Sequence, residues 1–202
     1  MILASSSPRR RELLTRLGVP YIPFSPAVDE TPLPGETPLQ TQHRITLEKA
    51  RAADAAPGQI VIAADTTVLL DGDMLNKPAD AAEARDMLRR LRGRTHEVQS
   101  CLVIRQDGRE TMEIVSSLVT MRPYSDDEIA AYIATGDPFD KAGSYAVQHA
   151  VFQPVARIQG CPLNVVGLPL CRLRAHLCDW PEPSPVCAAF WGGPCEESER
   201  RD

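Results

Sequence analysis

The chain has 202 residues, 43% of them hydrophobic, and a formal net charge of −5 at pH 7. This length is enough for one well-buried core, with room for two lobes around a cleft. The negative charge argues against broad, non-specific binding to nucleic acid, and no stretch approaches the roughly 20 apolar residues that a membrane span needs. Because the first residues also lack a basic segment followed by a long apolar one, we expect a cytoplasmic protein. Six cysteines without a Cys-x-x-Cys pair indicate reduced thiols that mostly serve packing.

A short strand at residues 1–4 is predicted to lead into a helix that starts at Pro8 and ends at Gly18. Proline suits the first helical turn, where its missing N–H costs nothing. The N-terminus of a helix offers free N–H groups and the positive end of a dipole, which suits phosphate. Serines and arginines surround this end: Ser5, Ser7, Arg9 and Arg10. A solvated basic turn on an amphipathic helix is the alternative.

Residues 21–24 are predicted to form a second strand, and residues 27–36 a proline-rich loop. The loop carries two neighbouring carboxylates, Asp29 and Glu30. Such a pair can bind a metal ion, or it is simply an exposed acidic loop. Thr37 and Pro38 then open a longer helix that we expect to continue to about residue 55, and this helix carries Lys49.

A buried strand is predicted at residues 60–70. Apolar residues run unbroken from Ile60 to Ala64, which is typical of a strand buried on both faces, and Asp65 stands where this run ends. In open α/β sheets, ligands collect at the carboxyl ends of strands. Asp65 is therefore a candidate site residue, with a turn cap as the alternative.

A tight turn at residues 71–73 is followed by a helix over about residues 80–92. Lys77 precedes this helix by a few residues and is a candidate for the same pocket as Asp65, although a surface lysine is the alternative. Residues 95–105 and 111–122 are predicted to pair as strands, and Ser125 and Glu128 form a capping box that opens a helix to Thr135. The polar, glycine-containing stretch 137–148 is predicted to be a pocket loop, or else a tight structural turn.

The last predicted helix follows residues 164–169 and ends near Cys178. From residue 179 onward, prolines and glycines break any regular pattern, and residues 196–202 are highly charged. We expect an extension outside the core, which is ordered only if Val186, Phe190 and Trp191 dock on something.

Seven short motifs stand in a fixed order along residues 1–178. They are Ser5-x-Ser7-Pro8-Arg9-Arg10, Glu48-Lys49-Ala50, Ala64-Asp65-Thr66, Lys77-Pro78, Gly93-Arg94-Thr95-His96-Glu97-Val98, Asp140-Lys141-Ala142-Gly143-Ser144-Tyr145 and Val165-Val166-Gly167-Leu168-Pro169. In this combination and order they resemble the Maf family of nucleoside triphosphate pyrophosphatases. By this resemblance, residues 1–178 form a Maf-like domain and residues 179–202 a Pro/Cys-containing, charged extension.

The resemblance implies an α/β fold similar to the inosine triphosphate pyrophosphatases, with two lobes, a mixed twisted β-sheet, flanking helices and a central cleft. It implies release of pyrophosphate from a nucleoside triphosphate, a divalent cation (Mg²⁺ or Mn²⁺) as cofactor, and a homodimer. In the family, the acid that matches Asp65 is the proton acceptor, and the residues that match Lys49, Lys77 and Glu30 belong to the active cleft. We expect Glu30 and Asp65 to share the metal ion, and Ser5, Ser7, Arg9 and Arg10 to hold the triphosphate.

Three positions of the resemblance bear on the base. Arg9, Thr66 and Gln148 match residues that mark preference for dTTP and UTP, and the amide of Gln148 suits the edge of uracil or thymine. Two rival readings stay open at this point. One is a modified pyrimidine nucleotide as the substrate. The other is a non-catalytic, nucleotide-sensing regulator of septum formation and cell division. His96 begins a predicted strand and is interpreted as structural.

Overall fold

The computed structural model describes residues 1–177 and 180–191, and its centre is a mixed seven-stranded β-sheet. The strands follow the order β2-β1-β3-β5-β6-β7, and β4 pairs with β3. Their bounds are β1 (Ile2–Ala4), β2 (Ile22–Phe24), β3 (Val61–Leu70), β4 (Asp73–Leu75), β5 (Thr95–Gln106), β6 (Arg109–Met121) and β7 (Val155–Gln159). β1 runs parallel to β2 and β3, while the β3–β5, β5–β6 and β6–β7 pairs are antiparallel. The predicted mixed α/β fold is confirmed.

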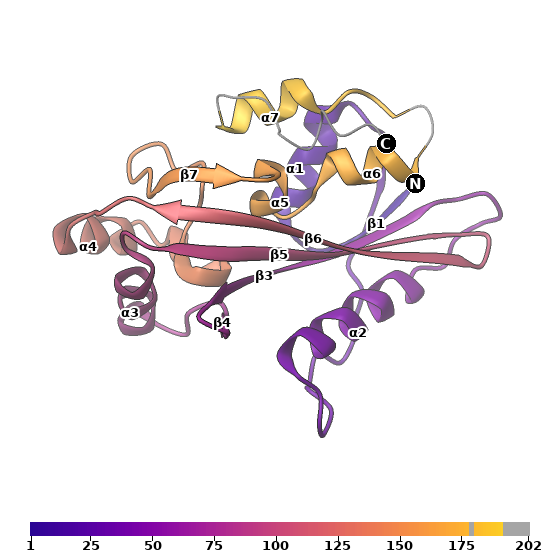
Figure 1. Cartoon of the computed structure of the whole chain (residues 1–202). Helices are drawn as coiled ribbons and strands as arrows, with labels where there is room; N and C mark the ends of the chain where they lie inside the picture. The colour runs from indigo at the N-terminus through magenta and orange to yellow at the C-terminus, as the bar shows by residue number, and fades with distance from the viewer. Residues whose placement is uncertain (178–179, 192–202) are drawn as a thin grey trace.

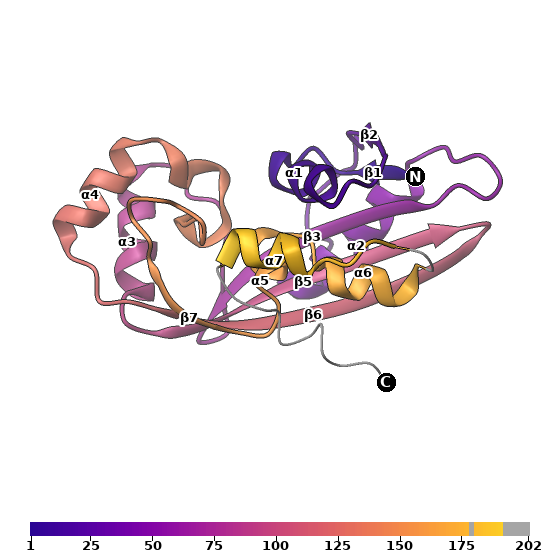
Figure 2. The same cartoon turned by 90° about the horizontal axis from the view of Figure 1, so that it is seen from above.

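The helices cover both faces of the sheet (Figure 1). Their bounds are α1 (Pro8–Leu17), α2 (Pro38–Arg51), α3 (Ala81–Leu91), α4 (Asp126–Ala134), α5 (Pro162–Val166), α6 (Leu170–His176) and α7 (Ser184–Trp191). Helix α2 lies against one face, whereas α1, α5, α6 and α7 lie against the other. Seen from above, α3 and α4 gather at the opposite end of the sheet from α6 and the N-terminus (Figure 2).

Helix starts follow local chemistry. Pro8 and Pro38 occupy the first turns of α1 and α2, and Thr37 and Ser125 form complete capping boxes with Gln40 and Glu128. The capping box predicted at residue 125 is therefore confirmed. Helix α2 ends at Arg51 rather than near residue 55, so the prediction was one turn too long.

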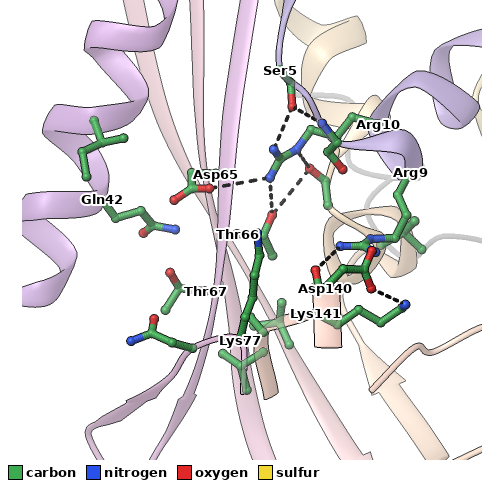
Figure 3. A pocket seen from close by; sticks show the side chains of 18 of the residues that line it. Ser5, Arg9, Arg10, Gln42, Asp65, Thr66, Thr67, Lys77, Asp140 and Lys141 are labelled. Carbon is green, nitrogen blue, oxygen red and sulfur yellow. Dashed lines mark hydrogen bonds and ion pairs between the residues drawn. The ribbon is translucent and has the colours of Figure 1, made fainter. Parts of the chain in front are cut away.

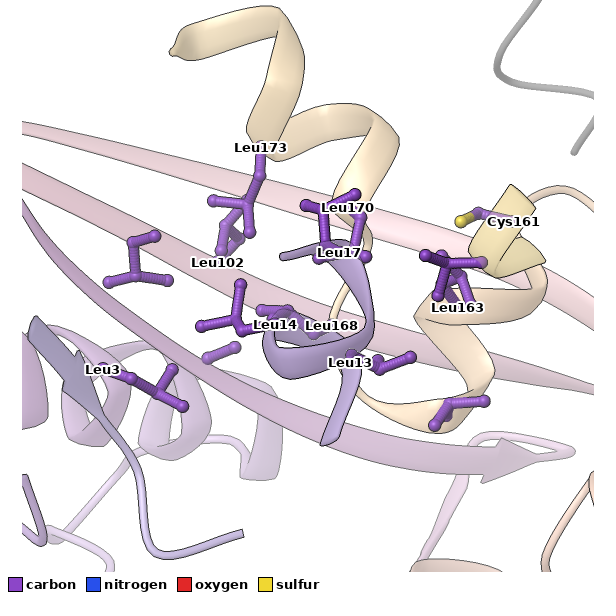
Figure 4. Packing of buried hydrophobic residues seen from close by; sticks show 14 of the residues in the cluster. Leu3, Leu13, Leu14, Leu17, Leu102, Cys161, Leu163, Leu168, Leu170 and Leu173 are labelled. Atoms are coloured by element: carbon purple, nitrogen blue, oxygen red, sulfur yellow. The ribbon is translucent and has the colours of Figure 1, made fainter. Parts of the chain in front are cut away.

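The largest core cluster lies between the sheet and the α1, α6 and α7 layer (Figure 4). It includes Leu3, Leu13, Leu14, Leu102 and Leu173, none more than 1% exposed. Burying one such side chain contributes roughly 1.5–3 kcal/mol before the cost of ordering the chain is counted. This cluster fixes α1, and so it fixes the direction in which the preceding serine and arginine turn points.

The segment after residue 179 differs from its prediction. Residues 184–191 form α7, and its Val186 and Cys187 are buried in the same cluster as Leu13 and Leu14, with Phe190 partly buried against them. The prediction of an irregular extension outside the core is wrong for this helix, because apolar residues three to four apart give it a face that can be buried. The predicted helix end at Cys178, the breakers Gly192, Gly193 and Pro194, and the charged residues 196–202 lie outside the described residues.

Three elements were absent from the prediction. Strand β7 and the short helix α5 carry little local periodicity, and the predicted pocket loop contains two 3₁₀ helices, η1 (Asp137–Asp140) and η2 (Ala142–Ser144). Across the described residues, every helix falls short of the length and apolarity that a membrane span needs.

Candidate active site

Asp65 lies in the middle of β3, not at its end as the sequence suggested. Strand β5 pairs with one edge of β3 from Val61 to Leu69. On the other edge, β1 pairs only with Val61 and Ile62, and β4 pairs only from Val68 to Leu70. Within the described residues, no strand covers this edge between positions 63 and 67, so a polar side chain in mid-strand faces a gap between its neighbours.

The two faces of β3 serve different purposes because side chains alternate along a strand. Val61 and Ala63 pack in a cluster with Ala50 and Ala53, at and beyond the end of α2. Asp65 and Thr67 continue this face toward α2. Thr66 has the opposite direction, and its hydroxyl contacts Ser100 Oγ at 2.8 Å and accepts from Arg10 Nη2 at 3.2 Å.

A cleft of about 750 Å³ opens at this edge and contains every site residue that the sequence predicted. They come from five separate stretches of the chain: Ser5, Ser7, Arg9, Arg10, Glu30, Lys49, Asp65, Thr66, Lys77 and Gln148. The serine and arginine turn and Asp65 therefore share one cavity, as the proposed chemistry requires. Their individual roles stay predictions.

Arg10 connects three elements beside Asp65 (Figure 3). Its Nε donates to the Gly167 carbonyl at 2.8 Å, its Nη1 to Ser5 Oγ at 3.1 Å, and its Nη2 lies 4.0 Å from Asp65 Oδ1. Burial lowers the pKa of Arg10, and the charge of Asp65 opposes part of this shift. Only 11% of the side chain is exposed, so Arg10 offers fewer open donors to a ligand than the sequence implied.

A second network crosses the cleft from α1 to η1. Arg9 Nη1 donates to Asp140 Oδ2 at 2.7 Å, and Lys141 Nζ donates to Asp140 Oδ1 at 2.6 Å and to Asp137 Oδ1 at 2.9 Å. Burial alone would raise the pKa of the Asp140 carboxyl, but Lys141 and Arg9 hold it below its ordinary value. Asp140 and Lys141 were quoted as a motif but not predicted as site residues, although that motif was the signal that could have found them.

All three lysines of the chain line the cleft. Lys49 Nζ pairs with Glu30 Oε1 at 2.7 Å, and Lys141 is held by the two aspartates described above. Lys77 is exposed and makes no ion pair with any described residue. Its charge is therefore the one most readily available to a polyanion.

The loop of η1 and η2 is held against β3 by close packing at Gly143. This glycine has φ 70°, and a Cβ there would lie 3.1 Å from a methyl carbon of Val68, so a larger residue would force the two apart. Its N–H donates to the Asn76 carbonyl, next to Lys77. Tyr145 follows on the cleft wall and is anchored from behind by His96, whose Nε2 lies 2.7 Å from the phenol oxygen. His96 does not line the cleft, which agrees with its structural interpretation.

Two predicted base contacts differ in availability. The Thr66 hydroxyl is engaged by Arg10 and Ser100, which leaves it one open lone pair. Gln148 is half-buried on the cleft wall and has no hydrogen bond to another described residue from its side chain. Gln148 is therefore the better placed of the two to read a base.

The acidic groups of the cleft fit a sparsely ligated cation. Among the described residues, no group of three or more His, Cys, Asp or Glu side chains forms a metal cluster. Magnesium commonly uses only one or two carboxylates together with water and substrate phosphates. Asp65 fits this pattern, since its side chain is 34% exposed and its nearest cation is 4.0 Å away. Glu30 is already paired with Lys49.

The comparison with protein families matches this geometry. A family model described as "Maf-like protein" matches residues 1–180, which includes every predicted site residue. The chain belongs to the Maf family. The sequence resemblance is thereby confirmed, and the matched residues extend from β1 past α6.

Curated relatives of this Maf protein cover most of its length. A protein of Symbiobacterium thermophilum is 44% identical over 173 residues, 85% of this chain and 89% of the relative. One of Anaeromyxobacter dehalogenans strain 2CP-1 is 46% identical over 182 residues (88% and 92%), and one of Burkholderia thailandensis is 45% identical over 189 residues (87% and 90%). Each of these three relatives is named dTTP/UTP pyrophosphatase.

Proposed function

We propose that this Maf protein is a nucleoside triphosphate pyrophosphatase that converts dTTP and UTP to the monophosphate and pyrophosphate. The observation that carries the proposal is a carboxylate, Asp65, that faces the same cleft as Arg9, Arg10, Lys49 and Lys77. A carboxylate beside a polyanion site weakens binding by repulsion, so its presence is explained by chemistry on a bound substrate. The names of the relatives support the same reaction.

The cations of the cleft hold the triphosphate. Lys77 provides a charge that no described carboxylate neutralises, and the N-terminus of α1 adds N–H groups and the positive end of its dipole. Arg10 acts chiefly as a positioning residue, because its buried guanidinium fixes Ser5, Thr66 and Gly167 around the cleft. Arg9 exchanges the carboxylate of Asp140 for phosphate oxygens when the nucleotide enters.

Asp65 acts on the water. It accepts a hydrogen bond from a water molecule in line with the bond between the α- and β-phosphates, and takes its proton as the oxygen attacks the α-phosphorus. The bond to the β-phosphate breaks, and pyrophosphate leaves with its charge balanced by the lysines and arginines. The nearly fixed position of Asp65 in a paired strand lowers the entropic cost of this geometry.

A divalent cation, Mg²⁺ or Mn²⁺, is part of the proposal. Asp65 would hold it, with Glu30 contributing once Lys49 turns to the phosphates. When bound, such an ion supplies neutralisation of phosphoryl charge and a more acidic water.

Gln148 is proposed to read the base. Its amide offers one acceptor and two donors, which match the N3–H and carbonyl edge of uracil or thymine. Cytosine presents the opposite order, so we expect a lower kcat/KM for CTP. A modified pyrimidine triphosphate with the same edge is accommodated by the same contacts.

The test is release of pyrophosphate by the purified protein across dTTP, UTP, CTP, ATP and GTP, with Mg²⁺ or Mn²⁺ and with chelator. We expect turnover of dTTP and UTP that chelator abolishes. Asp65→Asn should lower kcat by at least about 100-fold and leave nucleotide binding largely intact, since the variant keeps the shape of the side chain. The matched control is Asp54→Asn, an exposed acid outside the cleft. Near-normal turnover of Asp65→Asn would remove Asp65 from the mechanism.

A nucleotide-sensing regulator without catalysis finds no support in a described residue of the site, and it would be favoured only if nucleotide bound without pyrophosphate release. Three other expectations stay proposals: a homodimer, the absence of a stable nucleic-acid complex, and a cytoplasmic location.

A further inference from the structure

Gln42 is a buried amide without a partner. It lies on α2, is 4% exposed, and neither Nε2 nor Oε1 has a hydrogen-bond partner among the described residues. Burying such a group without a hydrogen bond is unfavourable, so native proteins almost always satisfy it. A residue that lines the cleft and breaks this rule indicates that its partner enters with a ligand.

The side chain of Gln42 is aimed at the catalytic face of β3. Lys49 follows Gln42 by seven residues, two helical turns, and lines the same cleft. Figure 3 shows the amide of Gln42 pointing into the space beside Asp65 and Thr67. The proposed base reader Gln148 and the phosphate-binding turn of α1 belong to other walls of the cleft.

The chemistry of an amide that nothing holds in place narrows the ligand group that suits it. A phosphate offers only acceptors, so it would satisfy Nε2 and repel Oε1. A base edge offers donor and acceptor in a fixed order, which requires an amide whose orientation the protein fixes. Because no described residue contacts either amide atom of Gln42, both orientations are equally available. Two neighbouring hydroxyls suit both orientations, since each hydroxyl can donate and accept.

We propose that Gln42 binds the adjacent 2′- and 3′-hydroxyls of the substrate ribose and gives the cleft a preference for ribonucleotides. The inference rests on the proposed function, because it assigns the sugar to the wall of the site that the base and phosphates leave open. One hydroxyl donates to Oε1 while the other accepts from Nε2. A 2′-deoxyribose satisfies only one of the two amide atoms.

The experiment compares UTP with dUTP, which differ only at the 2′-position. Wild-type protein is expected to show a higher kcat/KM for UTP, and Gln42→Met, which keeps the length of the side chain without its polar atoms, should lower the UTP to dUTP ratio about fivefold to tenfold. Gln99→Met is the control, because Gln99 lies on β5 outside the cleft and contacts Ser116 instead. In the absence of nucleotide, the urea midpoint of Gln42→Met should equal or exceed that of wild type, since no hydrogen bond is lost.

The outcomes separate the two proposals. If wild-type protein releases pyrophosphate from no triphosphate, the proposed function fails, whatever Gln42 does. If wild type turns over UTP but Gln42→Met changes kcat/KM for UTP and dUTP by the same factor, Gln42 does not bind the ribose and the inference is overturned. A marked fall of the urea midpoint in Gln42→Met would likewise overturn it, because it would show that the amide has a partner in the unliganded fold.

Discussion

Acid is expected to loosen the cleft wall through His96. This histidine is 3% exposed, its Nε2 lies 2.7 Å from the Tyr145 hydroxyl, and its Nδ1 is buried without a partner among the described residues. Burial lowers the pKa of His96 from 6.5 to about 4. Protonation would place a charge in the core directly behind a residue that lines the cleft.

The sign and size of the effect follow from linkage. Because the pKa is lower in the folded state, the unfolded chain binds the extra proton between pH 6.5 and pH 4, and stability falls as the pH falls through this window. The full shift corresponds to about 3 kcal/mol, and about 2–3 kcal/mol of it is lost between pH 7 and pH 4.5. Exposed carboxylates whose pKa is held low by arginine, such as Glu36 and Asp126, lose their contribution only at lower pH, below their ordinary values of 4.5 and 3.8.

The assay is urea unfolding of wild type and His96→Gln at half-unit steps from pH 7 to pH 4.5. Glutamine keeps a polar atom for Tyr145 but does not titrate in this range. We expect the free energy of unfolding of wild type to fall by about 2–3 kcal/mol more than that of the variant over this range. Parallel curves for the two proteins would refute the reasoning, because they would show that His96 titrates alike in the folded and unfolded states.

Two further predictions concern one cleft residue and one core residue. Lys77→Ala should weaken nucleotide binding and lower kcat together, by roughly tenfold each, because no described carboxylate competes for its charge; the comparison is Arg109→Ala at the β5–β6 turn, and a change in only one parameter would contradict the dual role. Val186→Asp should lower the free energy of unfolding by roughly 3–5 kcal/mol, because it buries an unpaired charge in the cluster around Leu14. Ala189→Asp places the same charge on the exposed face of α7, so equal urea midpoints for these two variants would show that α7 does not dock.

Much of the fold followed from rules that act over a few residues. Proline and glycine fixed both ends of α1, capping boxes fixed the starts of α2 and α4, and the turn at Asp107 and Gly108 fixed the β5–β6 pair. Elements with weak local signals, such as β7 and α5, escaped prediction because they are stabilised by pairing with β6 and by burial rather than by their own periodicity.

The sequence by itself determined which residues meet in the cleft, because their motifs stand in the order of a known family and every predicted site residue lines one cavity. The tertiary structure alone decided how they are presented. Asp65 is accessible in mid-strand only because β1 and β4 stop short on the same edge of β3. Arg9 meets Asp140 across 131 residues, and the isolation of the Gln42 amide depends on what every neighbouring segment lacks. Local patterns carry no information about such distant neighbours, since pairing, burial and unsatisfied hydrogen bonds are properties of the packed chain.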